Sequence, residues 1–231
     1  MKEYEYLDEL ISRYPVLAPV KADIRTAYET MKECYERGGK LLIAGNGGSC
    51  ADSEHIVGEL MKGFVKKRLV SAEIEAALKT VDPQMGAELS EKLQQGLPAI
   101  ALTGHAGLTT AFMNDVDGSM TYAEQVLGYG EEGDVFLGIS TSGNSKNVLY
   151  AAVTAKAKGL KVIGLLGRDG GRIRGYSDTA IVVGLTGKDG GLLGKRADVA
   201  VIVPETETFK IQELHLPVYH ALCLMLEEYF F

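Results

Sequence analysis

Short apolar runs alternate with longer amphipathic segments along most of this chain. Apolar runs of about five residues are typical of buried parallel strands, and apolar residues three and four apart are typical of helices with one buried face. The predicted strands span residues 41–44, 98–102, 134–139, 160–166, 180–183 and 199–203. The predicted helices span residues 3–13, 20–37, 50–64, 146–158 and 211–230. This alternation predicts an α/β protein, a three-layer sandwich with a central parallel sheet flanked by helices.

Residues 66–97 interrupt this rhythm. They read as one amphipathic helix or as two, with Asp82-Pro83 as a turn between them. A segment of this length cannot bury a core of its own. We therefore expect a single domain over residues 1–231, extra N-terminal helices at 1–37, and a helical insertion at 66–97. The insertion should border the functional site and rest on the main body or on a neighbouring subunit.

A five-residue motif occurs twice near the C-terminal end of the predicted sheet. Residues 167–171 read Gly-Arg-Asp-Gly-Gly, and residues 187–191 read Gly-Lys-Asp-Gly-Gly. Each copy precedes an apolar run, so the unit is a loop followed by a strand. We interpret the repeat as one extra strand added at the edge of the sheet, in preference to a second ligand-binding loop.

Composition narrows the function classes. The net charge of −7 argues against a broad nucleic-acid-binding surface. No apolar stretch is long enough to span a membrane, and the first five residues are too acidic and polar for a signal peptide. The cysteines, Cys34, Cys50 and Cys223, show neither metal-binding nor redox spacing. We therefore expect a cytoplasmic protein with no membrane or nucleic-acid partner.

Two loops rich in glycine, serine and asparagine follow two of the predicted strands. Residues 45–49 read Gly-Asn-Gly-Gly-Ser, and residues 140–145 read Ser-Thr-Ser-Gly-Asn-Ser. Backbone N–H groups and the dipole of the following helix bind anions at such a turn, and hydroxyl groups add neutral donors. Neither loop ends in the Gly-Lys-Ser/Thr of a nucleotide-binding P-loop. The pattern favours a single phosphate on a small molecule, although two ordinary helix-capping loops would share it.

Histidines concentrate on two predicted helices. His55 and Glu59 are four residues apart and share one helix face, as do Gln212 and His220, which are eight apart. Of the four histidines, only His105 lies elsewhere, because His215 is also on the last helix. The two pairs could bind a divalent metal such as zinc, or act as base and acid without a metal. Isolated helical histidines are more often ordinary core or surface residues.

Taken together, these motifs resemble the sugar isomerase (SIS) fold, which is flavodoxin-like, and more narrowly the phosphoheptose isomerases. The resemblance covers nearly the whole chain except residues 66–97 and one copy of the repeat. It implies the isomerisation of sedoheptulose 7-phosphate to D-glycero-D-manno-heptose 7-phosphate by proton transfer through an enediol. It also implies a homotetramer with sites shared between subunits, for which the N-terminal helices are the natural packing surface.

The resemblance also implies a role for each matched residue. Glu59 would be the base and His220 the acid. The phosphate would be held by Ser140, Thr141, Ser142 and Ser145. The sugar would be contacted by Asn46, Gly47, Gly48, Ser49, Glu59, Asn114, Asp115 and Gln212. One zinc ion per subunit would be bound by His55, Glu59, Gln212 and His220.

Two departures from the family pattern leave other functions open. Members often carry an arginine shortly after the glutamate, where this chain has Lys62-Gly63. The insertion at 66–97 falls between Glu59 and Asn114, beside the expected sugar site. The protein could therefore act on another ketose phosphate, such as a pentose phosphate. It could also be a non-catalytic SIS protein that senses a phosphosugar or binds a protein partner, although Glu59 and His220 argue against this.

Overall fold

The described strands form one parallel sheet with the order β2-β1-β3-β4-β5-β6. The computed structural model describes residues 2–183, 201–202 and 207–231. The strands are β1 (Leu41–Gly45), β2 (Ala99–Ala101), β3 (Val135–Ser140), β4 (Lys161–Gly167), β5 (Thr179–Val183) and β6 (Val201–Ile202). The first five have the flavodoxin-like order. The α/β prediction is confirmed.

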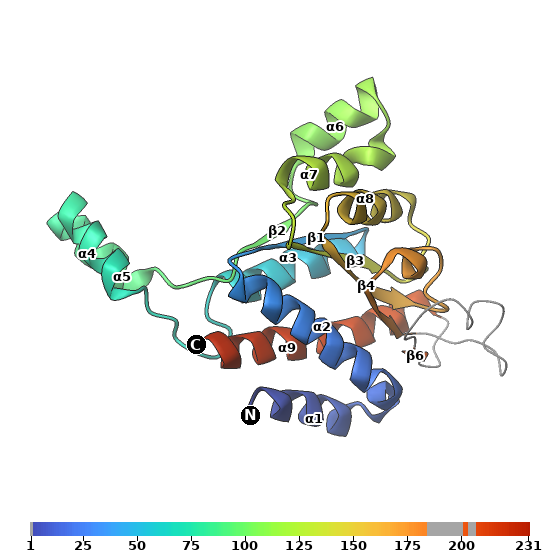
Figure 1. The fold of residues 1–231 in the computed structure, drawn as a ribbon, viewed down its shortest axis with the longest axis horizontal. Helices are drawn as coiled ribbons and strands as arrows, with labels where there is room; N and C mark the ends of the chain where they lie inside the picture. The colour runs from blue at the N-terminus through green and yellow to red at the C-terminus, as the bar shows by residue number, and fades with distance from the viewer. Residues whose placement is uncertain (1, 184–200, 203–206) are drawn as a thin grey trace.

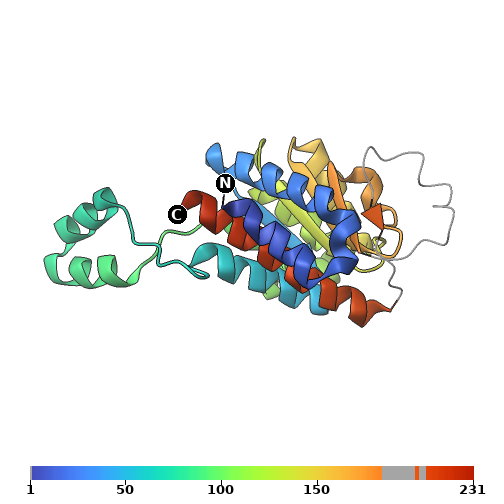
Figure 2. The same ribbon diagram turned by 90° about the horizontal axis from the view of Figure 1, so that it is seen from below.

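Helices cover both faces of this sheet (Figures 1 and 2). One face carries α1 (Glu3–Arg13), α2 (Lys21–Glu36), α3 (Gly48–Met61) and α9 (Thr208–Phe230). The other face carries α7 (Thr121–Tyr129) and α8 (Lys146–Ala157), with α6 (Ala106–Asp115) beyond them. Short 3-10 turns lie at Pro15–Val20, Gly118–Met120 and Ile173–Tyr176. Because successive strand residues face opposite sides, Leu41 and Ile43 enter one core, and Leu42 and Ala44 enter the other.

Two elements went unpredicted because they lack an apolar stripe. Helix α6 buries none of its residues, and α7 buries Thr121, Gln125 and Val126, of which only one is apolar. The predicted edge strands of the repeat are present, since β5 and β6 end the sheet. The second copy of the motif, at residues 187–191, lies outside the described residues.

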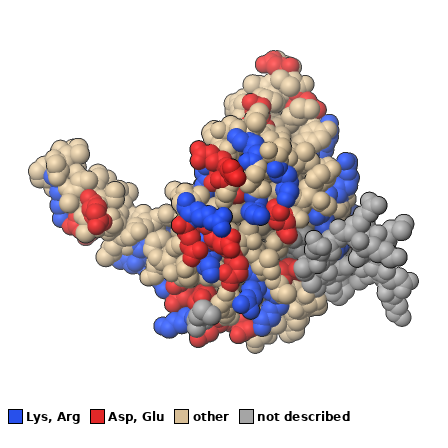
Figure 3. Space-filling view, viewed as in Figure 1, with Lys and Arg blue, Asp and Glu red and all other residues tan. Residues whose placement is uncertain are grey.

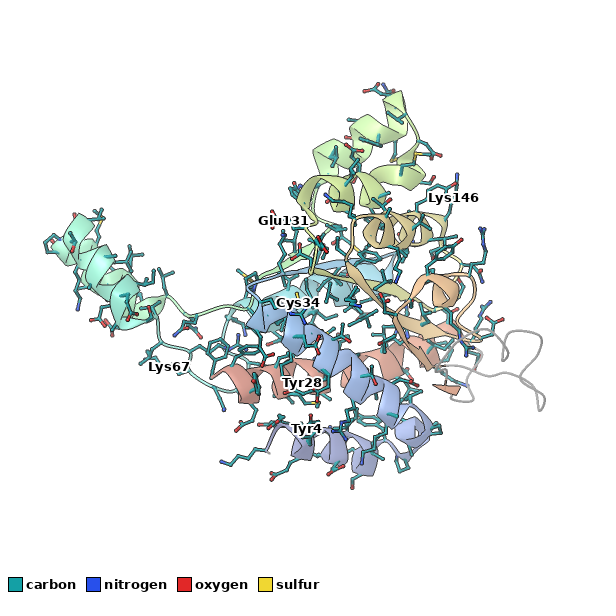
Figure 4. All side chains as sticks on the ribbon, viewed as in Figure 1. Tyr4, Tyr28, Cys34, Lys67, Glu131 and Lys146 are labelled. Carbon is teal, nitrogen blue, oxygen red and sulfur yellow. The ribbon has the colours of Figure 1, made fainter. Side chains whose placement is uncertain are left out.

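The N-terminal helices pack on their own chain. The apolar stripe of α2, which includes Ile24, Tyr28 and Met31, is buried in the core beneath the sheet. Figure 4 labels Tyr4 on α1 and Tyr28 on α2, whose ring centroids are 5.8 Å apart. Contact between subunits through these helices, which stays a prediction, can therefore use only their outward faces.

The insertion forms a helical hairpin that stands clear of the body (Figures 1 and 2). We call helices α4 (Ala72–Val81) and α5 (Pro83–Lys92) the arm. The Asp82 carboxylate caps α5 by accepting from two backbone N–H groups. Most large apolar side chains of the arm are exposed, although Leu78 is half-buried, and Val81 retains 88% of its accessible surface. The chain's own body therefore does not support the arm, and support from a neighbouring subunit stays a prediction.

Within one chain, the arm does not border the two glycine- and serine-rich loops. These loops precede α3 and α8, whereas the arm leaves the body after the other end of α3. Figure 4 labels Lys67 at the base of the arm. The arm therefore lies at the end of α3 that carries Glu59 and away from the two loops, and the expectation that it borders the functional site stays a prediction.

The surface carries charged side chains of both signs. Acidic and basic side chains are interspersed on the face shown in Figure 3, so neither sign dominates it. In the part of the chain that the structure describes, no helix has the length and apolar character needed to cross a membrane.

One buried histidine makes stability depend on pH. His215 is fully buried, and its Nε2 lies 3.3 Å from the carbonyl oxygen of Leu166. Burial disfavours the imidazolium form and lowers the pKa of His215 to about 4. The unfolded chain therefore binds a proton below pH 6.5 that the folded chain binds only near pH 4.

Stability should fall as the pH drops from about 6.5 to 4. Over this range the His215 contribution is about 3 kcal/mol, from a shift of roughly two and a half pKa units. We expect the free energy of unfolding of the wild type to decline by that amount more than that of His215→Gln. Urea unfolding between about pH 7 and pH 4 measures both proteins, and parallel curves would exclude this role for His215.

Candidate active site

The two glycine- and serine-rich loops lie together at the carboxyl ends of neighbouring strands. Strands β1 and β3 pair in parallel, with Gly45 opposite Ile139. The side-chain amides of Asn46 and Asn147 exchange two hydrogen bonds of 2.9 and 2.8 Å, which join the first loop to α8. The Tyr122 hydroxyl donates to the Gly45 carbonyl oxygen at 2.9 Å. The two loops and the N-termini of α3 and α8 thus bring backbone N–H groups together in one place, an arrangement suited to binding an anion.

The second loop is held by its own hydroxyl groups. The Oγ atoms of Ser140 and Ser145 are 3.0 Å apart, and Ser140 Oγ accepts from the N–H of Gly143 at 3.1 Å. Ser142 Oγ accepts from the N–H of Asn144 at 3.2 Å. Thr141 and Ser142 are half-buried, so both remain within reach of a ligand.

A close backbone contact requires glycine in this loop. Gly143 has a φ of +63°, and an added Cβ would lie 1.9 Å from the carbonyl oxygen of Gly170. The N–H of Arg172 also donates to the Asn144 side chain at 3.1 Å. The first copy of the repeated motif thus packs against the second loop. No local spacing in the sequence predicts this contact.

The predicted sugar-contacting residues differ in their placement. Asn46, Gly47 and Gly48 are exposed on the first loop, whereas Ser49 is buried. Asn114 and Asp115 are exposed at the end of α6, where the Asn114 amide donates to the Asp115 carboxylate at 2.6 Å. Among the described residues, their side-chain contacts join them to each other and to neither loop.

A second group of polar side chains lies further along α3, and we call His55, Glu59 and His220 the acid–base cluster. His55 Nε2 is 3.2 Å from Glu59 Oε1, and the rings of His55 and His220 have centroids 5.0 Å apart. His55 Nδ1 shares a hydrogen bond of 3.0 Å with the hydroxyl of Tyr219, which also donates to Asp52 at 3.2 Å. Tyr219 and Asp52 were not predicted, because no sequence spacing relates α9 to α3.

Two atoms of this cluster are buried without a hydrogen-bond partner among the described residues. They are Glu59 Oε2 and His220 Nε2. Lys62 Nζ lies 3.5 Å from Glu59 Oε2. Burial, together with nearby His55, lowers the pKa of His220, although Glu59 opposes the shift. The neutral form of His220 is therefore favoured, and His220 Nε2 and Glu59 Oε2, the latter beside Lys62, can exchange protons with a ligand.

Three of the predicted zinc ligands, His55, Glu59 and His220, lie together in the acid–base cluster, but Gln212 lies apart from them within one chain. Helices α3 and α9 run parallel, because Gln212 lies level with Gly48, and Tyr219 lies level with His55. A Cβ on Gly48 would be 2.6 Å from the Gln212 amide nitrogen. Gln212 thus adjoins the first loop, about 10 Å along α9 from Tyr219 at roughly 1.5 Å per residue. In the described part of the chain, no three His, Cys, Asp or Glu side chains are arranged to hold a metal ion.

Comparison with known proteins decides the family. The phosphoheptose isomerase of a Nitratiruptor species is 36% identical over 99% of this chain and 97% of its own length. That of Pelobacter propionicus is 33% identical over 100% and 95%. The chain belongs to the phosphoheptose isomerase family. The SIS domain model matches residues 75–167, which include the second loop.

Solved structures of phosphoheptose isomerases agree with this assignment. The structure from Francisella tularensis has a TM-score of 0.67 and 28% identity, covering 97% of this chain and 95% of that one. The structure from Neisseria gonorrhoeae has a TM-score of 0.61 and 32% identity, covering 87% and 84%. The resemblance inferred from the motifs is confirmed, and the SIS fold with it.

Proposed function

We propose that this protein is a phosphoheptose isomerase that interconverts sedoheptulose 7-phosphate and D-glycero-D-manno-heptose 7-phosphate. The observation that carries the proposal is the acid–base cluster, in which the half-buried Glu59 and His220 each present one buried atom without a hydrogen-bond partner among the described residues. The anion-binding loops at the start of α3 and α8 supply the phosphate site that such a substrate requires. Membership of the family supports the same activity.

The reaction moves one proton between adjacent carbons. Glu59 removes a proton from C1 of the ketose, and the released electron pair forms the C1–C2 double bond of the enediol. The N–H of His220 gives its proton to the C2 oxygen. Glu59 then returns the first proton to C2, while the C1 hydroxyl gives its proton to His220. His55 holds one oxygen of Glu59, and the other oxygen, which lies beside Lys62, is the one that would meet the substrate.

We propose that each site combines residues of two subunits in a homotetramer. Glu59 lies in the last turn of α3, eleven residues after Gly48 (59 − 48 = 11). This separation is about 16 Å along the helix axis. A fully extended heptose 7-phosphate spans about 10 Å at ordinary bond lengths. A sugar whose phosphate is held on the loops is therefore too short to reach the cluster of the same chain, and we propose that another chain supplies it.

Zinc and a cytoplasmic location are further parts of the proposal. The resemblance to the family supports one zinc ion per subunit. Within one chain Gln212 lies apart from the acid–base cluster, so the proton transfers described above are assigned to Glu59 and His220 alone. The described cysteines are free, which supports a cytoplasmic location.

Replacing Glu59 by glutamine should abolish isomerisation and leave the fold intact. The change removes the base without altering its size, so kcat should fall at least about 10²-fold. A panel of phosphosugars followed for ketose–aldose conversion measures this and identifies the preferred substrate. Glu54→Gln, an exposed change on the same helix, is the matched control. Near-normal turnover by Glu59→Gln would remove this residue from the mechanism.

Mixing two defective variants tests for shared sites. Glu59→Gln lacks the base, and Ser142→Ala with Ser145→Ala weakens the phosphate loop. If Glu59 and the loop come from different chains, some sites in mixed oligomers contain neither defect. We therefore expect co-expressed subunits to regain activity at low substrate concentration. Sites formed within one chain would give no gain.

Metal analysis of the reconstituted protein tests the zinc proposal. We expect one equivalent in the wild type and its loss in His55→Ala and in His220→Ala. Modest affinity is expected, since an amide such as that of Gln212 is a weak neutral ligand. Full activity after exhaustive chelation, with no metal detected, would show that the cluster works alone.

A further inference from the structure

A buried ion pair lies beside the acid–base cluster. Arg68 and Glu227 are both fully buried, with Arg68 Nε 2.8 Å from Glu227 Oε1. The guanidinium also lies over the ring of Phe231, 4.6 Å from its centroid. The desolvation of two charges is costly, and buried ion pairs are often replaced by apolar side chains without loss of stability. The pair therefore invites an explanation other than stability.

Arg68 caps the end of α3 at Glu59 itself. Its Nη1 donates to the Leu60 carbonyl oxygen at 2.7 Å, and its Nη2 donates to the Glu59 carbonyl oxygen at 3.1 Å. Carbonyl groups in the last turn of a helix have no partner within the helix, and the dipole there favours a cation. The guanidinium thus fixes the backbone that carries the proposed base.

Glu227 fixes the turn that follows α3. Its carboxylate accepts from the backbone N–H groups of Phe64, Val65 and Lys66 at 2.8, 2.9 and 3.2 Å. Burial raises the pKa of Glu227, but these N–H groups and Arg68 outweigh it and hold the pKa below its usual value. The turn places the ring of Phe64 5.4 Å from that of His220, centroid to centroid.

We propose that Arg68 and Glu227 are positioning residues for the isomerisation, because together they fix the backbone of Glu59 and the Phe64 ring that packs on His220. Neither side chain reaches the substrate, and the inference rests on the proposed function. The planar guanidinium donates from three nitrogens to three separate acceptors, whereas the ammonium of a lysine donates from a single nitrogen. The pair thus sets the spacing between base and acid.

Three changes separate positioning from stability. In Arg68→Lys and in the double variant Arg68→Met with Glu227→Leu, we expect kcat to fall about 10- to 100-fold with KM nearly unchanged, as for a small displacement of reacting groups. The matched control is Asp134→Asn, which breaks another ion pair, with Lys40, and removes a buried charge at the amino ends of β1 and β3. It should lower the free energy of unfolding and leave kcat unchanged.

A spectroscopic measurement makes the outcome independent of turnover. The imidazole resonances of His220, assigned with His220→Gln, should shift in Arg68→Lys and stay in place in Asp134→Asn. Unshifted resonances with wild-type kcat in a folded Arg68→Lys would overturn the proposal. The proposal would also be overturned if kcat fell only in proportion to the loss of stability, to the same extent in Arg68→Lys as in Asp134→Asn. Failure of the wild type to convert any phosphosugar would instead reject the proposed function, and the inference with it.

Discussion

The parallel packing of α3 against α9 is the arrangement on which the candidate site depends. The two helices lie in step, with Gly48 beside Gln212 and His55 beside Tyr219, and the register continues to Phe64, in the turn after α3, which lies beside Glu227. The residue offset is 164 at the first two levels and 163 at the third (212 − 48, 219 − 55 and 227 − 64). Each level has its own chemistry: the first loop, then the acid–base cluster, then the buried ion pair. A slip of one turn would separate all three.

The polarity of α3 organises the charges along this seam. Its N-terminus faces the loops, where backbone donors favour an anion, and its C-terminus is capped by a guanidinium. The proposed base lies at the C-terminal end, so the binding and chemical functions occupy opposite ends of one helix. The proposed assembly of subunits would bring the two ends of different chains together.

The arm leaves large apolar side chains exposed to solvent within one chain. Each of its helices has ten residues, a length that is marginal for an isolated helix in water. The two chain segments that join the arm to the body are nevertheless hydrogen-bonded to each other. The N–H of Gln95 donates to the Arg68 carbonyl oxygen at 2.9 Å, and the N–H of Gly63 donates to the Gln94 side chain at the same distance. The arm is thus held away from its own body by specific hydrogen bonds, and a large apolar residue such as Val81 is left to contact another surface.

Local patterns in the sequence were enough to predict the sheet, most flanking helices, both loops and the pairing of His55 with Glu59. These features follow from apolar periodicity, glycine and serine turns, and the four-residue repeat of a helix, all of which act between near neighbours. The contact of Tyr219 with His55, the position of Gln212 beside Gly48, and the burial of Arg68 against Glu227 were decided by the tertiary structure alone. Each depends on the register between distant segments of the chain, which side-chain packing sets and no local spacing encodes. The direction of the arm has the same origin, since amphipathicity predicts a buried face without naming the surface that buries it.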